Sequence, residues 1–182
     1  IILINITLFA QASKSKIDSI NTIGYDEVVS NIEQSTKLFT ENLEKARSIT
    51  YPKGEGQALS NLALVNYLKG NYDKSTQYHI ESFKIFNDNK MYKELSDAYG
   101  EYGYQLKRRD LNKPLSYMRL AIKVADDYNV SRAFKSKLYD NYGVLKEMQN
   151  DADSAIFFYK KALEIKKANR DTIGIPYSLN KI

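Results

Sequence analysis

Large and small residues recur at helical spacing between residues 139 and 162. A first set is Tyr139, Tyr142 and Gly143, and a second set, which follows after a turn, is Ala155, Tyr159 and Ala162. Residues three and four apart share one face of a helix, so each set forms a single stripe on its helix. The small residues let two antiparallel helices approach closely, and the tyrosines fill the space beside the contact. The pattern therefore predicts a pair of packed helices.

Both sets occur twice more at earlier positions. The first set recurs 40 residues upstream as Tyr99, Tyr102 and Gly103, and another 40 residues upstream as Leu59, Leu62 and Ala63. The second set recurs as Pro114, Met118 and Ala121, and as Ser75, His79 and Ser82. Proline is tolerated in the first turn of a helix, where its missing N–H would have no partner. Copies at a constant spacing indicate an internal repeat of about 40 residues.

The repeat predicts helices throughout the chain, because its apolar residues show helical spacing and not the alternation of strands. We expect helices over residues 14–22, 26–50, 56–69, 73–88, 91–108, 112–127, 131–149, 152–168 and 173–182. Tyr51, Pro52 and Gly54 are expected in a loop, and Gly70 at the end of a helix. Partial repeats are indicated at both ends, by Leu43, Ala46 and Ile49 and by Ile175, Leu179 and Ile182. The sequence predicts an all-α fold of antiparallel helix pairs.

These residues resemble the tetratricopeptide repeat family over about residues 38–182. The resemblance implies a right-handed α-solenoid, with helices about one turn longer than in the standard 34-residue unit. Residues 53–62 (KGEGQALSNL) and their partial echo at 172–180 are similar to exported sensor regions that precede histidine kinases or DNA-binding output domains in some bacteria. A sensing role is implied by this resemblance only.

In such a solenoid the first helix of each pair lines the concave face, where ligands are expected. The candidate groove residues are Asn61, Leu64, Tyr67, Glu101, Tyr104, Lys107, Arg108, Asp140, Asn141 and Val144, with Ser60, Asp97, Lys137 and Glu147 beside them. Asn61 and Asn141 could hold a peptide backbone, and Lys107 with Arg108 could pair with a carboxylate. Alternatively, the asparagines only face solvent, and the two cations only offset the negative end of a helix dipole.

Composition restricts the chemistry of the chain. The 27 basic and 22 acidic residues give a net charge of +5 but are mixed along the sequence, which favours solvated helix faces over a nucleic-acid surface. Cysteine is absent, and the one histidine, His79, replaces an aromatic residue of the repeat, which favours a packing role. No phosphate loop, zinc motif or nucleophile elbow occurs, so we expect a protein without enzymatic activity, metal or cofactor.

The first 12 residues carry a candidate signal peptide. The apolar run Ile1–Ala10 is followed by Ala10-Gln11-Ala12, a small-x-small sequence of the kind that signal peptidase accepts. The run is too short to span a bilayer as a helix. The alternative is an apolar first helix or strand that packs on the repeats. With a signal peptide, residues 13–182 form the repeat domain, and the protein is periplasmic or otherwise exported; without one, it is cytoplasmic.

The function expected from the sequence is a scaffold that binds a peptide or protein segment in the concave groove. One version is the extracytoplasmic sensing or interaction region of a bacterial signalling protein. The other is a stand-alone adaptor without signalling output. Apolar end faces of a solenoid also favour a homodimer. No nucleic acid is expected as a partner, and a membrane contact is expected only through segments outside this chain.

Overall fold

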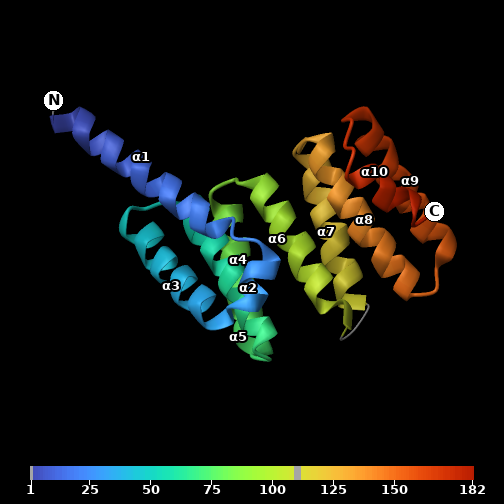
Figure 1. The fold of residues 1–182 in the computed structure, drawn as a ribbon, viewed down its shortest axis with the longest axis horizontal. Helices are drawn as coiled ribbons and strands as arrows, with labels where there is room; N and C mark the ends of the chain where they lie inside the picture. Colours follow the sequence, from blue (N-terminus) through green and yellow to red (C-terminus); the bar gives the residue numbers. More distant parts are fainter. Residues whose placement is uncertain (1, 109–111) are drawn as a thin grey trace. The chain divides into compact units, whose positions relative to one another are not determined.

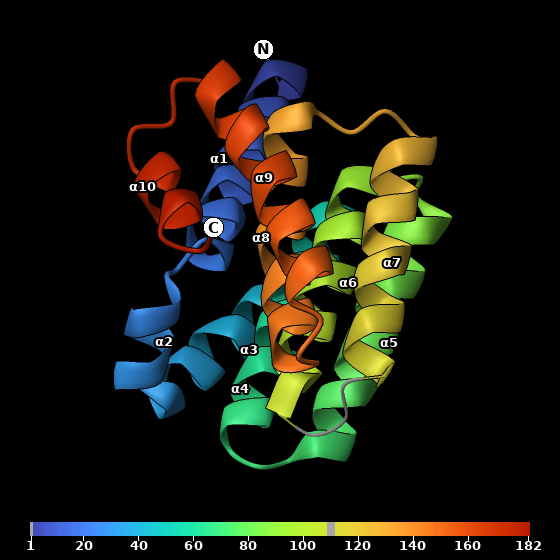
Figure 2. The ribbon, with the colours of Figure 1, turned by 90° about the vertical axis from the view of Figure 1, so that its right-hand side faces the viewer.

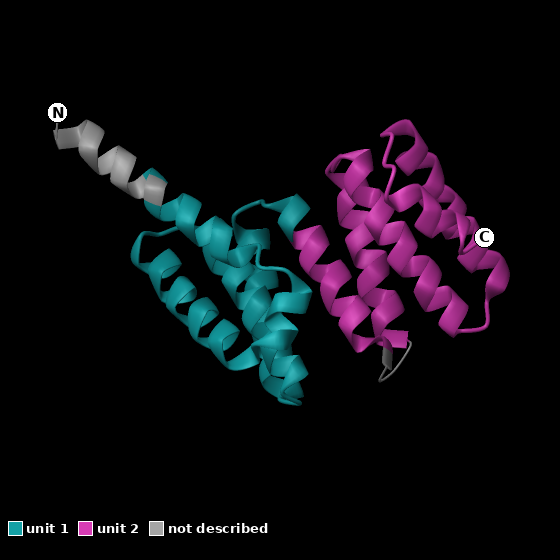
Figure 3. Ribbon diagram, viewed as in Figure 1, with its two compact units in different colours: residues 1–94 teal, residues 95–182 magenta. Residues whose placement is uncertain are grey.

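The computed structural model describes residues 2–108 and 112–182, with the side chains of residues 11, 13–107 and 112–182. The chain forms two compact units, residues 1–94 and residues 95–182 (Figure 3). Every regular element in the described part of the chain is a helix. The all-α fold and the packing of consecutive helices in adjacent pairs are therefore confirmed.

In the described part of unit 1, three helices precede the closely packed pair α4 and α5. Its elements are α1 (Ile2–Asn21), α2 (Tyr25–Ser30), α3 (Ile32–Ser48), α4 (Pro52–Leu68), α5 (Tyr72–Asp88) and the start of α6 (Tyr92–Gln105) (Figure 1). Helix α4 packs against α5 on one side and against α3 on the other, and α1 packs on both α3 and α4. Helices α1 and α3 therefore extend the repeat toward the N-terminus, with the short α2 between them.

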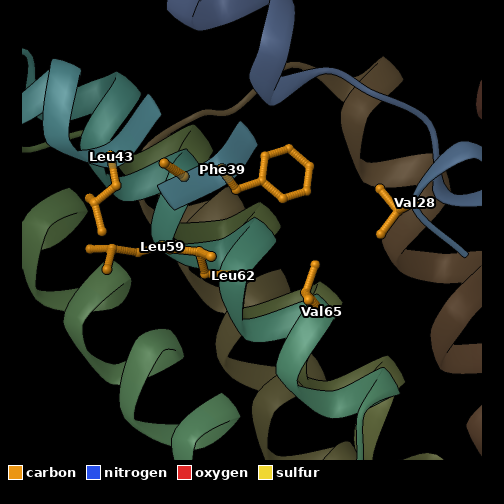
Figure 4. Close-up of a cluster of buried hydrophobic side chains, with 7 residues drawn as sticks. Val28, Phe39, Leu43, Leu59, Leu62 and Val65 are labelled. Carbon is orange, nitrogen blue, oxygen red and sulfur yellow. The ribbon is translucent and has the colours of Figure 1, made fainter. Parts of the chain in front are cut away.

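The core of unit 1 forms where α2, α3 and α4 meet (Figure 4). Its members are almost fully excluded from solvent; they are Val28, Phe39, Leu43, Ala58, Leu59, Leu62 and Val65. Burial of each large apolar side chain stabilises the fold by roughly 1.5–3 kcal/mol. The predicted stripes of Leu59 and Leu62 on α4 and of Leu43 on α3 are thus core positions.

The boundaries around α3 and α4 differ from the predicted ones. The helix expected over 26–50 is interrupted at Asn31, where φ is −144° and ψ is 63°. The prediction of a loop over residues 51–54 is wrong beyond Tyr51, because Pro52 begins α4. Two glycines lie inside α4, where side chains from other helices approach the backbone closely. A Cβ on Gly54 would lie 2.5 Å from Ile17 Cγ2, and one on Gly56 would lie 2.4 Å from Phe86 Cε1.

The first helix also begins earlier than predicted. Helix α1 begins at Ile2, whereas the expected helix began at residue 14. Within α1, Lys14 lies over the ring of Tyr51 at 5.2 Å from its centroid, and Ile17 is buried. The side chains of residues 1–10 and 12, which carry the signal-peptide prediction, lie outside the described part.

Unit 2 repeats the same architecture. Its elements are the remainder of α6, the short 3₁₀ turn η1 (Leu106–Arg108), α7 (Asn112–Asp127), α8 (Arg132–Met148), α9 (Ala152–Ala168) and α10 (Gly174–Leu179) (Figure 2). Helix α8 packs on α7 and α9, and α10 packs on α9. The core of this unit is Leu115, Met118, Ala121, Ala125, Leu138, Tyr142 and Leu145.

The small residues of the repeat occupy close helix contacts in unit 2, as predicted. A Cβ on Gly143 of α8 would lie 2.5 Å from Cε1 of Tyr159 on α9. One on Gly103 of α6 would lie 2.9 Å from the backbone oxygen of Pro114, which is in the first turn of α7. Larger residues at either glycine would push the paired helices apart.

Six helices end in the same left-handed turn. The second residue after each helix has positive φ; these residues are Thr50, Gly70, Lys90, Asn129, Asn150 and Arg170. After α3, Thr50 N donates to Arg47 O at 3.1 Å and Tyr51 N donates to Ala46 O at 2.9 Å. These bonds satisfy carbonyls that a helix end would leave free. The prediction that Gly70 ends α4 is confirmed.

Candidate functional site

The candidate groove residues divide between the two units. Asn61, Leu64 and Tyr67 lie on α4 in unit 1. The remaining seven lie in unit 2: Glu101, Tyr104, Lys107, Arg108, Asp140, Asn141 and Val144. Each group is a separate candidate surface.

In unit 1, the candidate residues are engaged within the fold. The amide of Asn61 donates to the backbone oxygen of Asn21, at the end of α1, over 3.0 Å. Leu64 packs against the core of the unit. The ring of Tyr67 lies edge-on to Tyr72, with centroids 5.4 Å apart. Asn61 therefore holds α1 in place and uses one of its two amide N–H donors within the fold.

Two further asparagines complete this attachment of α1. Asn42 Nδ2 donates to Asn21 Oδ1 at 2.8 Å and to the backbone oxygen of Ile17 at 3.0 Å. Asn21 Nδ2 donates to the backbone oxygen of Gly54 at 2.9 Å. The sequence analysis missed this network. The signal was present, because Asn21 lies 40 residues before Asn61, one period of the repeat.

Asp18, one turn earlier on α1, forms the outer part of the same attachment. Its carboxylate accepts a hydrogen bond from Tyr51 Oη at 2.9 Å and lies 3.4 Å from Lys53 Nζ. Burial, reinforced by the bond to Asp18, raises the pKa of Tyr51 to about 12. The tyrosine therefore stays protonated and can keep donating near neutral pH.

In unit 2, a lysine on α8 pairs with two carboxylates on α6. Lys137 Nζ lies 3.3 Å from Asp97 Oδ1 and also contacts Glu101. Burial opposes the charged form of Lys137, but the two carboxylates outweigh it and raise its pKa. Glu101 is thus already paired with a cation. All three side chains remain partly exposed, so a ligand can reach this ion pair.

Tyr104 lies beside a cation of its own segment: Lys107 Nζ lies over its ring at 3.4 Å from the centroid, a cation–π contact. In the C-terminal segment, Lys166 Nζ lies 5.1 Å from the ring centroid of Tyr177, and Lys181 Nζ lies 2.9 Å from Glu147 Oε2. Burial, followed by the negative charge of Asp140, raises the pKa of Tyr177. The fold therefore brings Tyr177 against α9 and Lys181 against α8. The side chain of Arg108 lies outside the described part.

Asp140 occupies a different environment from the one predicted. Its residue is only 8% exposed, and its carboxylate contacts Lys166 of α9 and accepts a hydrogen bond from Ser178 Oγ at 3.2 Å. Burial raises the pKa of Asp140, whereas Lys166 and Ser178 act in the opposite direction. The carboxylate is thus part of the interior, because its helix faces α9 and α10 at this residue.

Asn141 and Val144, next to Asp140 on α8, are half-buried. Further along α8, Glu147 accepts hydrogen bonds from Tyr159 Oη at 2.7 Å and from Lys181 Nζ at 2.9 Å. These bonds lower the pKa of Glu147. The accessible part of the candidate site in unit 2, here called the α6–α8–α10 surface, therefore consists of Asp97, Glu101, Tyr104, Lys107, Lys137, Asn141, Val144, Glu147, Tyr177 and Lys181.

Two further groups bear on the chemistry. His79 is fully buried in unit 1 and stacks on Phe83 with ring centroids 5.8 Å apart, in agreement with a packing role. Within the described residues, no group of His, Cys, Asp and Glu is arranged to hold a metal ion. Among the helices in that same part of the chain, none is long and apolar enough to cross a membrane.

The fold is similar to that of two solved structures. No protein-family model and no curated protein matches the sequence. The chain is similar to BtubC (BKLC) from P. vanneervenii, with a TM-score of 0.64 and 18% identity over 87% of this chain and 72% of that one. It is also similar to the apo form of RapI, with a TM-score of 0.65 and 15% identity over 86% of this chain and 58% of that one. At such identities the likeness concerns the fold alone, and it supports a helical-repeat architecture.

Proposed function

We propose that this protein is a non-catalytic scaffold that binds a peptide or protein segment on the α6–α8–α10 surface. The observation that carries the proposal is the set of aromatic and charged side chains on α6, α8 and the C-terminal segment, with Lys107 Nζ 3.4 Å from the ring centroid of Tyr104 and Lys181 Nζ 2.9 Å from Glu147 Oε2. Tyrosines supply large, rigid contact area at a small entropic cost, and lysine adds a charged hydrogen-bond donor. Helical repeats commonly bind partners on such extended surfaces, and kinship with the tetratricopeptide family is part of this proposal.

The lysines of this surface can exchange a carboxylate of the chain for a carboxylate of a ligand. Lys137 and Lys181 are satisfied by carboxylates of the chain, yet both pairs are partly exposed. Exposed pairs contribute only about 0–1 kcal/mol each. A ligand carboxylate can therefore replace Glu101 or Glu147 at small cost, while a ligand backbone reaches the amide of Asn141.

Selection from a displayed library of random peptides tests the proposal. Selected peptides are then measured by fluorescence anisotropy against the wild type and the Tyr104→Ala and Lys181→Ala variants. Both variants should bind at least about tenfold more weakly. Lys181→Ala should keep a thermal unfolding close to that of the wild type, and Tyr104→Ala should lose only part of the stability, because Tyr104 is half-buried against the core of unit 2. Tyr25→Ala is the matched control, because Tyr25 is an exposed tyrosine of unit 1.

The surface is wrongly assigned if selected peptides bind both variants as tightly as the wild type. It is also wrongly assigned if Tyr104→Ala unfolds the protein, since Tyr104 would then be a core residue. Turnover of any substrate class by the purified protein would contradict the non-catalytic part of the proposal.

We also infer an exported protein, with a sensing role as the finer form of the proposal. The supporting pattern is the apolar run Ile1–Ala10 with the small-x-small sequence Ala10-Gln11-Ala12 at its end. Cleavage there would leave Ile17 and Asn21 attached to α3 and α4. Mass spectrometry of protein expressed with its natural leader in a Gram-negative host should show Ser13 as the first residue. An uncleaved cytoplasmic product would overturn export and favour the adaptor.

A further inference from the structure

A buried cluster of polar side chains joins three helices of unit 2. It consists of Asp140 on α8, Lys166 on α9 and Ser178 on α10, here called the α10 cluster. Their exposed fractions are 8%, 6% and 0%. Lysine and aspartate are rarely buried to this degree unless they are paired. The position of the cluster, between α10 and the helix pair beneath it, indicates that it acts on the attachment of α10.

The three side chains of the cluster donate to and accept from one another. Lys166 Nζ contacts the Asp140 carboxylate and donates to Ser178 Oγ at 2.9 Å. Ser178 Oγ donates in turn to Asp140 Oδ1 at 3.2 Å, so the hydroxyl both accepts and donates. The ring of Tyr177 faces the same ammonium at 5.1 Å. Ser178 thus supplies the α10 part of the cluster, while the ion pair itself belongs to α8 and α9.

Helix α10 depends on these contacts for its structure. It has six residues, and so short a helix is unstable in water without tertiary packing. Asp171 Oδ1 accepts from Gly174 N at 2.8 Å and fixes the first turn, and Lys181 pairs with Glu147 at the surface. Leu179, in contrast, is 52% exposed. Few apolar contacts therefore oppose detachment of α10.

Detachment also relieves the ion pair. Burial of two charges costs several kcal/mol per ion before their attraction offsets it. When α10 leaves, Asp140 and Lys166 stay together on α8 and α9 and regain water. Detachment loses the two hydrogen bonds of Ser178, the contact of Tyr177 with Lys166, the exposed Lys181–Glu147 pair and the burial of α10. Local opening should therefore require much less free energy than unfolding of the unit.

We propose that α10 opens and closes separately from α6–α9, and that the α10 cluster holds it in the closed position. This rests on the proposed function in one respect: α10 and the residues after it carry Tyr177 and Lys181. Opening removes Tyr177 from Lys166 and Lys181 from Glu147, and so dismantles the α6–α8–α10 surface. A ligand that contacts both sides binds only the closed form and shifts the equilibrium toward it.

Hydrogen exchange of the ligand-free full chain tests the opening without reference to binding. The reporting amides are those of residues 175 and 177–182, compared with the interior amides of α9. In the wild type, α10 amides should exchange at least about a hundredfold faster than those of α9, because they need only local opening. Ser178→Ala should accelerate α10 exchange by about tenfold further and leave α9 unchanged.

Two more variants test whether the α10 cluster, and not the exposed Lys181, holds α10 in the closed position. Lys181→Ala removes the exposed anchor of the C-terminal segment and should accelerate exchange by no more than about threefold. Asp140→Asn leaves Lys166 unpaired when α10 is closed, so it should accelerate α10 exchange more than Ser178→Ala does. If Asp140→Asn unfolds the protein, the Ser178→Ala result decides.

Equal protection of α10 and α9 in the wild type would overturn the proposal, because α10 would then open only with the whole unit. Unchanged α10 exchange in Ser178→Ala would overturn the role of the cluster. Acceleration of α9 and α10 to the same extent would also count against it, since the cluster would then stabilise the unit as a whole. Failure of peptide selection affects none of these outcomes, so the two proposals fail separately.

Discussion

Replacement of Gly143 by alanine tests the close approach of α8 and α9. An added Cβ would lie 2.5 Å from Cε1 and 2.7 Å from Cδ1 of Tyr159, well inside contact distance. The ring cannot move away freely, because Tyr159 is 1% exposed and its hydroxyl donates to Glu147 at 2.7 Å. The helices must separate, or the tyrosine must give up its position and its hydrogen bond.

The expected loss of stability follows from three contributions. Alanine in place of glycine within a helix favours folding by about 1 kcal/mol. Overpacking opposes it by about 1–3 kcal/mol, and loss of a hydrogen bond to a charged acceptor by about 1.5–3 kcal/mol. We expect a net destabilisation of about 1.5–5 kcal/mol. For a chain of this length, each kcal/mol lowers the melting temperature by about 2–4 °C.

Urea and thermal unfolding of Gly143→Ala measure this loss. Gly24→Ala is the control, because nothing lies within 4 Å of a Cβ there, and it should change the free energy of unfolding by no more than about 0.5 kcal/mol. In a double-mutant cycle, Tyr159→Leu should relieve at least about 0.5 kcal/mol of the cost of Gly143→Ala. A Gly143→Ala variant as stable as the wild type would refute the contact.

Other expectations concern helix ends, acidity and association. Thr50→Gly should stabilise the protein by about 0.5–1.5 kcal/mol in urea unfolding, because a β-branched residue with φ of 51° is strained. Hydrogen bonds lower the pKa of Glu147, so its contribution to the free energy of unfolding is present above its ordinary pKa of 4.5 and is lost on acidification. Between about pH 6 and about pH 3, the melting temperature should therefore fall less in Glu147→Gln than in the wild type. Leu179 and Ile182 are exposed, so light scattering should detect self-association at high concentration that Leu179→Ser with Ile182→Ser reduces, and a monomeric wild type would contradict this.

The sequence predicted the helix pairs well because one physical requirement recurs in each repeat. Small residues at contacts and large ones beside them leave a pattern that a single sequence displays, as Gly143 and Tyr159 do. Glycine misled the prediction at Gly54, which was expected in a loop, because a single sequence does not show which neighbour approaches the backbone. In the structure, Ile17 fills the space that a side chain on Gly54 would need.

One helix of the repeat was predicted to exist, but three of its buried positions were missed. Ser35, Phe39 and Asn42 of α3 are buried, and they lie one period before Ser75, His79 and Ser82. Strict use of the 40-residue spacing would have identified them. The interruption at Asn31 could not be predicted in this way, because α2 has no counterpart in the later repeats.

The repeat predicted which helix face each candidate residue occupies, but not which of their hydrogen-bonding groups are already used by other residues of the chain. Periodicity shows which face of a helix a residue occupies, and Asn61 and Asn141 do occupy equivalent positions. It does not show which neighbour satisfies the side chain. Asn61 donates to the end of α1, Glu101 at the equivalent position pairs with Lys137, and Asn141 lies half-buried on α8. The repeats thus share a core and differ on their accessible faces. Under the proposed function, selectivity for a ligand comes from residues that depart from the repeat, such as Tyr104 and Lys181.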